Sequence, residues 1–377
     1  MINKKRLLAL AQKLIRINSE NPPGDERAIA RFVARTLKKA GLKPRVLRFY
    51  KQRDNVVCVY KGRKSAKPLL ITPHLDTVPA GKGWSVGPFS GALWNGRIFG
   101  RGATDCKGNL AVAMEVLMSL AEDKAVLNHD VIFLATADEE SGSGKGLMPF
   151  LKADLLKFSY AVVLDSDEFN IVTAQKGLIH FKVQVKGRKA HGAYPDRGIN
   201  AIDRAFKLLL LLKNISWPHV RHRLLKAPTV NIGTIHGGDK VNMVPDWCEF
   251  EADLRFLPGM DAGRILSTIR GVFNRTKIPY AIHVHDIQQP YEIGRRHILV
   301  TSLEQASRPF VRRAAIKGSE GATVITFFQN LKIPAVATGY GSRGCAHATD
   351  EYVRLADLER GARSLENFVK VFDRRRS

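Results

Sequence analysis

The sequence has few cysteines, and none of them are closely spaced. Four cysteines (Cys58, Cys106, Cys248 and Cys345) are scattered through 377 residues, and no Cys-x-x-Cys occurs. A disulfide framework or a zinc knuckle requires more cysteines at shorter spacing, so neither is expected.

Long hydrophobic runs are also missing. No stretch approaches the roughly 20 apolar residues that a membrane-spanning helix requires. The basic start at residues 1–6 is followed by a segment, 7–17, that Gln12, Lys13 and Arg16 interrupt, and no small-residue cleavage site follows. We therefore expect a cytoplasmic protein that has no membrane partner.

Acidic residues are in short supply. The chain has 35 Asp and Glu against 60 Lys and Arg, which gives a formal net charge of +25. Such a charge attracts nucleic acid or an acidic substrate. The basic residues are scattered, with few aromatic residues among them, which favours a diffusely basic surface over a nucleic-acid groove. A basic nucleic-acid-binding protein remains the non-enzyme alternative.

The hydrophobic pattern predicts two domains of different construction. Continuous apolar strands at 69–72, 131–137 and 160–164 alternate with helices, which indicates an α/β domain. We expect residues 1–176 and 290–377 to form this domain, with a mostly parallel sheet covered by helices on both faces. Residues 177–289 instead alternate apolar and polar positions in the order β-α-β-β-α-β, which predicts an inserted ferredoxin-like α+β domain.

Histidines and carboxylates follow the apolar strands of the first domain. His74 and Asp76 come just after the strand at 69–72, on the same side of extended backbone. A carboxylate so placed can fix the tautomer of a metal-bound histidine, although His-x-Asp alone is more often a surface pair. The other such residues at strand ends or in the connecting loops are Asp105, Glu139, Glu140, Asp165 and His347.

These residues are expected to meet, because ligands bind at the carboxyl ends of strands in open parallel sheets. So many carboxylates at one edge would repel each other unless some stay protonated or a dication binds between them. Two histidines with several carboxylates suit Zn²⁺, and Co²⁺ or Mn²⁺ can substitute.

The motifs together resemble those of the zinc-dependent M20 peptidases and amidases. This group includes acetylornithine deacetylase, succinyl-diaminopimelate desuccinylase, aminoacylase-1 and the glutamate carboxypeptidases. The resemblance runs across almost the whole chain. The matching residues are His74-Leu75-Asp76-Thr77-Val78-Pro79, Gly100-Arg101-Gly102 with Asp105 and Lys107-Gly108, Asp138-Glu139-Glu140, Asp165, and Ala346-His347 with Glu351.

The resemblance implies a site with two Zn²⁺ ions. Asp105 would bridge them, His74 and Asp165 would complete one, and Glu140 and His347 the other. Asp76 would orient His74. Glu139 would be the general base, which deprotonates a water bridging the metals and then protonates the leaving amine. Asp167 competes with Asp165 for its position, but its spacing to Gly177 fits the family less well.

The inserted domain resembles the family's lid or dimerisation domain, which implies a homodimer. His191, in Lys189-Ala190-His191-Gly192, would reach the active site of a second subunit and stabilise the oxyanion. Asn242 and Arg255 would contact substrate, the arginine through the substrate carboxylate. Without the resemblance, His191 and Arg255 would be interpreted as a turn histidine and a solvated arginine.

Two positions depart from the family pattern. Gly321 stands where many members carry an Asp, so the specificity of better-known relatives does not transfer directly. Cys106 replaces the usual Met after the bridging Asp, and is expected to be a small packed hydrophobe.

The predicted function is hydrolysis of the amide bond of an N-acyl amino acid or small peptide that bears a free carboxylate, of the deacetylase or desuccinylase type. A dipeptidase or glutamate-type carboxypeptidase is the alternative within the family. The excess positive charge, with Lys317 and Arg343 near the site, favours a dianionic substrate.

Overall fold

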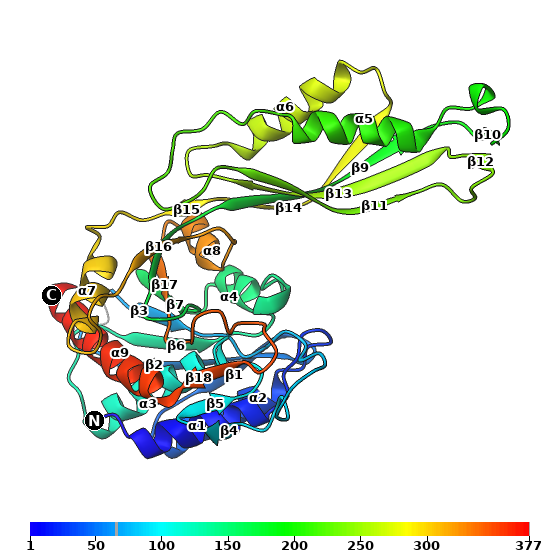
Figure 1. Cartoon of the computed structure of the whole chain (residues 1–377). Helices are drawn as coiled ribbons and strands as arrows, with labels where there is room; N and C mark the ends of the chain where they lie inside the picture. Colours follow the sequence, from blue (N-terminus) through cyan, green and yellow to red (C-terminus); the bar gives the residue numbers. More distant parts are fainter. Residues whose placement is uncertain (65–66, 377) are drawn as a thin grey trace. The chain divides into compact units, whose positions relative to one another are not determined.

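A computed structural model describes residues 1–64 and 67–376, which form two compact units (Figure 1). The first unit comprises residues 1–173, 293–317 and 327–377, and the second comprises 174–292 and 318–326. Within the described residues, no helix has both the length and the apolar character needed to cross a bilayer.

The first unit is built on a mixed sheet whose centre is parallel. Its strands occur in the order β1-β2-β6-β3-β7-β17-β8. The neighbours β6, β3, β7 and β17 pair in parallel, and they are short, apolar and fully or almost fully buried, as expected for strands inside an α/β domain. The bounds are β1 (Arg45–Tyr50), β2 (Arg53–Tyr60), β3 (Leu69–Thr72), β6 (Val131–Ala135), β7 (Tyr160–Leu164), β8 (Ile171–Gln175) and β17 (Ala335–Thr338).

Helices pack on this sheet and on one another. The helix α3 is buried along most of its length and contacts both α1 and α9. In α1, Leu7, Leu10, Leu14 and Ile15 recur at helical spacing and form the buried face. The bounds are α1 (Lys4–Arg16), α2 (Arg27–Lys39), α3 (Lys107–Glu122), α4 (Leu147–Ala153), α7 (Ile298–Ser307), α8 (Ile325–Asn330) and α9 (Leu355–Arg376). The predicted α/β class with a mostly parallel central sheet is confirmed.

A small antiparallel sheet joins residues 92–99 to the C-terminal part of the chain. It has the order β18-β5-β4, formed by β4 (Ala92–Trp94), β5 (Arg97–Phe99) and β18 (Tyr352–Arg354). Because β18 pairs with β5, Glu351 lies beside Gly100, whose N–H donates to the Glu351 carbonyl at 2.8 Å. This pairing brings the Glu351 side chain to the loop that carries Asp105.

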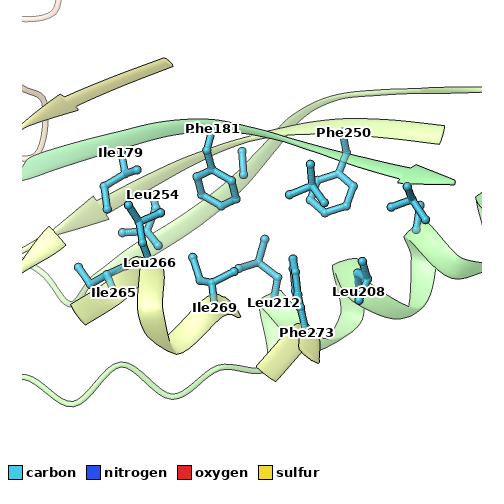
Figure 2. Close-up of a cluster of buried hydrophobic side chains, with 14 of the residues drawn as sticks. Ile179, Phe181, Leu208, Leu212, Phe250, Leu254, Ile265, Leu266, Ile269 and Phe273 are labelled. Carbon is cyan, nitrogen blue, oxygen red and sulfur yellow. The ribbon is translucent and has the colours of Figure 1, made fainter. Parts of the chain in front are cut away.

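The second unit is a four-stranded antiparallel sheet with two helices on one face. Its strand order is β11-β13-β9-β14. Side chains from the strands, such as Phe181 and Phe250, face Leu212, Ile269 and Phe273 from the helices (Figure 2). The bounds are β9 (Gly177–Lys186), α5 (Ala201–Lys213), β11 (Thr229–Gly237), β13 (Trp247–Phe256), α6 (Ala262–Asn274) and β14 (Tyr280–Gln288), which gives the order β-α-β-β-α-β.

The division of the chain differs from the expected one in three segments, because residues 174–176 and 290–292 fall in the second unit, as does a longer segment nearer the C-terminus. Residues 318–326 belong to the second unit, whereas the sequence placed all of 290–377 in the first. For residues 318–326, the reason is a set of hydrogen bonds to residues 175 and 176. The Gln175 Oε1 accepts from the N–H and hydroxyl of Thr323 at 3.1 and 2.7 Å, and the Lys176 N–H donates to the Ser319 carbonyl at 3.1 Å.

Candidate active site

The strand order brings the candidate residues to one edge of the parallel sheet. His74 follows β3 and forms a bridge with Thr136, just beyond β6. Asp165 directly follows β7, and its N–H donates to the carbonyl of Thr338, the last residue of β17, at 3.0 Å. Because β3, β6, β7 and β17 are parallel, the loops that follow them start at the same edge.

Asp105 lies between two imidazole rings. Its Oδ1 is 2.9 Å from the Nε2 of His74, and its Oδ2 is 3.2 Å from the Nε2 of His347. The same His347 nitrogen lies 3.3 Å from the Oε2 of Glu140. A carboxylate that faces a different histidine with each oxygen has the arrangement needed to bridge two cations.

Two donor groups can each hold one cation. One ligand atom from each of His74, Glu139 and Asp165 lies within 4.8 Å of the others, and the same holds for Asp105, Glu140 and His347. The structure therefore brings together the six side chains that the family resemblance assigned to the metals or to the general base. Each group contains one imidazole nitrogen and two carboxylates, a donor set that fits Zn²⁺, Co²⁺ or Mn²⁺.

The charges of the site show why positive ions suit it. Burial, followed by the charge of Asp105, raises the pKa of Asp165 to about 7. Burial and then Asp165 raise the pKa of Glu139 well above its usual range. Hydrogen bonds to Asp105 and Glu140 raise the pKa of His347 to about 10. Without cations, the carboxylates therefore hold protons themselves or attract them to the histidines, which is the behaviour of a site built for positive charge.

A sharp turn separates the two adjacent glutamates. The chain leaves β6 and passes through Asp138, whose φ of 63° is left-handed, into a single 3₁₀ turn, η1 (Glu139–Ser141). The Asp76 carboxylate accepts the N–H groups of Glu139 and Glu140, each at 3.1 Å. The end of the strand thus lets Glu139 join His74 while Glu140 joins His347.

The position of Asp76 differs in detail from the expectation. The Nδ1 of His74 is 3.0 Å from the backbone carbonyl of Asp76 and 3.5 Å from its Oδ1. The carbonyl is therefore the nearer partner that fixes the ring, in the way that metal-bound histidines require. The carboxylate of Asp76 mainly holds the turn of Glu139 and Glu140, a contact that the sequence analysis missed.

A second contact that the sequence did not reveal involves Glu351 and Arg101. The Glu351 Oε1 accepts the N–H groups of Thr104 and Asp105 at 2.8 and 3.0 Å. Its Oε2 accepts from Arg101 at 2.7 Å, and Arg101 also donates to the carbonyl of His347 at 3.3 Å. This ion pair links the loop of Asp105 to the loop of His347. The motif match marked both residues, but their contact depends on the pairing of β18 with β5.

A cavity of about 220 Å³ opens beside the two candidate aspartates. Asp105, Asp165 and Asp167 all line it. Among the described residues, Asp105 and Asp165 belong to a donor group and Asp167 does not. Asp167 instead accepts a hydrogen bond from the Asn170 amide at 2.8 Å. The geometry therefore favours Asp165 over Asp167.

Cys106 is buried, and its Sγ lies close enough to His74 and Asp105 to count as a donor. However, burial raises the pKa of its thiol to about 12, and the Sγ accepts the His74 N–H at 3.1 Å. A neutral thiol that already accepts a hydrogen bond is consistent with the expectation that Cys106 is a small packed side chain and not a metal ligand.

The remaining candidates lie in the second unit. His191, in β10 (Ala190–His191), pairs with Met243 of β12 (Met243–Val244), and the Gly192 N–H donates to the Asn242 carbonyl at 2.8 Å. The side chains of His191 and Asn242 are exposed on this small two-stranded sheet. Arg255 is different, because its guanidinium makes two hydrogen bonds with Asp253, at 2.7 and 2.9 Å.

Comparison with known proteins decides the family. The model of peptidase family M20/M25/M40 matches residues 70–371. The chain belongs to this family. This M20 chain is 30% identical over 314 residues to the acetylornithine deacetylase of Erwinia tasmaniensis, and the match covers 79% of each chain.

Solved M20 structures share the fold. An M20 metallo-carboxypeptidase from Sulfolobus solfataricus superposes with a TM-score of 0.83 at 20% identity, covering 97% of this chain and 99% of that one. A dinuclear metal-binding M20 peptidase from Bacillus subtilis gives a TM-score of 0.74 at 17% identity, with 97% of both chains covered. The expected resemblance is confirmed, and the chain is a hydrolase of the metallopeptidase and amidohydrolase class.

Proposed function

We propose that this M20 hydrolase cleaves the amide bond of an N-acyl amino acid or small peptide that bears a free carboxylate. The observation that carries the proposal is the arrangement of Asp105 between His74 and His347, with Glu139, Glu140 and Asp165 around them. The 30% identity to an acetylornithine deacetylase supports a deacylase over a carboxypeptidase.

Two Zn²⁺ ions are the proposed cofactors. Asp105 would hold both of them, together with His74 and Asp165 on one side and Glu140 and His347 on the other. Bound there, the cations supply Lewis acidity and lower the pKa of a water molecule toward neutrality.

Glu139 is the proposed general base. It belongs to the donor group of His74 and Asp165, and its carboxyl has a raised pKa, which suits a group that must both take and return a proton near neutral pH. It takes the proton from the attacking water and delivers it to the amide nitrogen as the bond breaks. The Asp76 carboxylate keeps Glu139 in place through the backbone N–H.

The second unit is proposed to supply substrate contacts and a homodimer interface. His191, exposed on the two-stranded β10–β12 sheet, would enter the active site of a second copy and stabilise the oxyanion. Phe206 and Leu210 on α5 are 55% and 60% exposed, and such an apolar helix face supports an interface. Asn242 and Arg255 would contact the substrate, and Arg255 would have to exchange Asp253 for the substrate carboxylate.

The compartment and the charge of the substrate complete the proposal. The four cysteines are all free and buried, which supports a reducing compartment such as the cytoplasm. The net charge of +25 favours a dianionic substrate over nucleic acid, since the site chemistry is that of a hydrolase.

The decisive experiment is a hydrolysis screen with Zn²⁺ or Co²⁺ over acetyl-, succinyl- and glutamyl-amino acids and over dipeptides. We expect turnover of an acyl-amino acid, abolished by a chelator and restored by the metal. Preference for dipeptides would select the peptidase alternative. No cleavage of any amide by the metal-loaded protein would refute the proposal.

A further inference from the structure

A buried polar network lies behind the turn that carries Glu139 and Glu140. At its centre is Arg53, the first residue of β2, whose side chain is only 6% exposed. Its Nη1 donates to the Glu26 Oε1 at 2.7 Å. Its Nη2 donates to the Asn21 Oδ1 at 3.1 Å and lies 3.4 Å from the Asp138 Oδ1. A guanidinium has its donors in a rigid fork, so it can fix several acceptors at once.

Asn21 connects Arg53 to the candidate active site through hydrogen bonds. Because its Oδ1 accepts from Arg53, its amide nitrogen must point the other way. That Nδ2 donates to the Asp76 Oδ2 at 2.9 Å and lies 3.3 Å from the Asp138 Oδ1. Asp76 in turn holds the N–H groups of Glu139 and Glu140. An unbroken chain of hydrogen bonds therefore runs from Arg53 to the backbone of both glutamates.

Asp138 forms a second branch of the network. Its Oδ2 accepts the N–H of Lys145 at 2.8 Å, and its own N–H donates to the Glu26 Oε1 at 3.4 Å. These bonds close the loop that carries the two glutamates. Arg53 is thus connected to that loop through Asp138 as well as through Asn21.

The local backbone is shaped to receive the guanidinium. Gly24 has a φ of 77°, and a Cβ at that position would fall 1.7 Å from the Arg53 Nη1. The neighbouring Asn55 of β2 binds both ends of the loop at residues 137–146. Its side chain accepts the Ala137 N–H at 2.8 Å and donates to the Gly146 carbonyl at 2.9 Å. The start of β2 is therefore a support for the loop at residues 137–146.

The charges explain why an arginine is needed there. Glu26, Asp76 and Asp138 are three buried carboxylates within one network, and Arg53 contacts two of them directly. Removing a cation from such a group leaves buried charges without compensation, which is strongly unfavourable. A lysine would keep the charge but not the fork.

We propose that Arg53 is a positioning residue for catalysis: acting through Asn21, Asp138 and Asp76, it sets the turn from which Glu139 and Glu140 reach into the site. It touches neither substrate nor metal. The catalytic part of this inference rests on the proposed function, and the structural part does not.

The test compares Arg53→Lys with Arg48→Lys. Arg48, in β1, is the matched control. Like Arg53 it pairs with a buried carboxylate, that of Asp54 near the start of β2, at 2.5 and 2.8 Å. Its side chain, however, is 56% exposed and has no bond to the 137–146 loop in the described structure. Asn21→Ser is the second variant, since it removes the amide bridge without adding charge. All proteins are measured well below their own melting temperatures, so a loss of stability does not hide the result.

The first readout is hydrogen exchange of the metal-free protein, followed by mass spectrometry. We expect about tenfold faster exchange or more in the peptide covering 137–146 for Arg53→Lys and Asn21→Ser, with β3 unchanged and the control like the wild type. Unchanged exchange in that peptide would overturn the proposal, whatever the substrate turns out to be.

The second readout is steady-state hydrolysis at saturating metal. Small displacements of a catalytic group can cost about 100-fold, so we expect kcat to fall by about tenfold to 100-fold with KM within about threefold. A normal kcat for Arg53→Lys would overturn the catalytic role. If the wild type cleaves no amide, the proposed function fails by itself, and the exchange measurement still decides whether Arg53 sets the turn.

Discussion

The Oε1 of Glu351 accepts the backbone N–H of Asp105 at 3.0 Å, although the two residues are separated by 246 positions in the chain. The other oxygen of Glu351 holds Arg101, which in turn donates to the carbonyl of His347. One buried carboxylate therefore fixes the loops of two proposed metal ligands. Groups of this kind, one step away from the metal, tune affinity through the orientation of the ligands.

We predict that Glu351→Gln weakens metal binding about 10-fold to 100-fold. The amide keeps one acceptor oxygen, but its NH₂ group faces the Gly102 N–H and the Arg101 guanidinium, which are also donors. Competition with a chromogenic chelator measures the change. Asp350→Asn is the control. The Asp350 carboxylate accepts from the N–H and the hydroxyl of the exposed Ser85, and it makes none of the bonds by which Glu351 holds Asp105 and Arg101. Equal affinities of the two variants would contradict the prediction.

Replacing the proposed base separates chemistry from metal binding. Glu139→Gln removes the group that moves the proton, so we expect kcat to fall by about 10²-fold to 10⁴-fold. All five proposed ligands remain, namely His74, Asp105, Asp165, Glu140 and His347, so metal content measured by atomic emission should stay at the wild-type level. A variant with near-normal turnover would remove Glu139 from its assigned role.

The choice between two aspartates can be tested directly. Asp165→Asn takes a carboxylate from the donor group of His74 and Glu139, whereas Asp167→Asn changes a residue that lines the same cavity but accepts from Asn170. We expect the first variant to bind one cation fewer per chain and the second to bind as the wild type does. Isothermal titration of the metal-free proteins with Zn²⁺ gives the stoichiometry. If Asp167→Asn loses one cation and Asp165→Asn loses none, Asp167 is the ligand.

The ligand set was predictable because it depends on local sequence. An apolar strand followed by His, Asp or Glu can be found without knowing the fold, and parallel strands bring their ends together. The support of these residues was not predictable. Arg53 and Asn55 are buried polar residues at the start of a strand, and their role depends on the antiparallel pairing of β2 with β6.

The second unit shows the same division. The alternation along β9 correctly indicates one wet face, because the period of two is local. The pairing of Arg255 with Asp253 also follows this period, since residues two apart lie on the same face of a strand. The family resemblance instead led us to predict that Arg255 binds the substrate carboxylate. The membership of residues 318–326 in this unit depends on contacts with Gln175, some 150 positions away, that no local pattern reveals.

Glu26 makes stability depend on pH. Burial, followed by the charge of Asp76, raises the pKa of Glu26 from 4.5 to about 7. A carboxyl with a raised pKa in the folded state favours folding below its unfolded pKa, and this contribution is lost as pH rises through 7. The difference corresponds to about 3 kcal/mol.

Glu26→Gln should therefore gain stability relative to the wild type as pH rises. The amide oxygen can still accept from Arg53 and from the Asp138 N–H, without a buried negative charge. We expect similar melting temperatures at pH 5 and an advantage of a few degrees for the variant at pH 8, measured by calorimetry. A wild-type protein that gains on the variant between pH 5 and pH 8 would show that Glu26 is stabilised as the anion.

The proposed role of His191 predicts complementation between two inactive proteins. His191→Ala lacks the oxyanion donor, and Glu139→Gln lacks the base. In a mixed dimer, the site with an intact Glu139 receives His191 from the other copy and works. Random exchange of subunits makes half of the dimers mixed, with one working site each, so activity should rise to about a quarter of the wild-type level. Mixtures no more active than their components would place His191 outside the neighbouring site, and a single-chain species in ultracentrifugation would exclude the dimer.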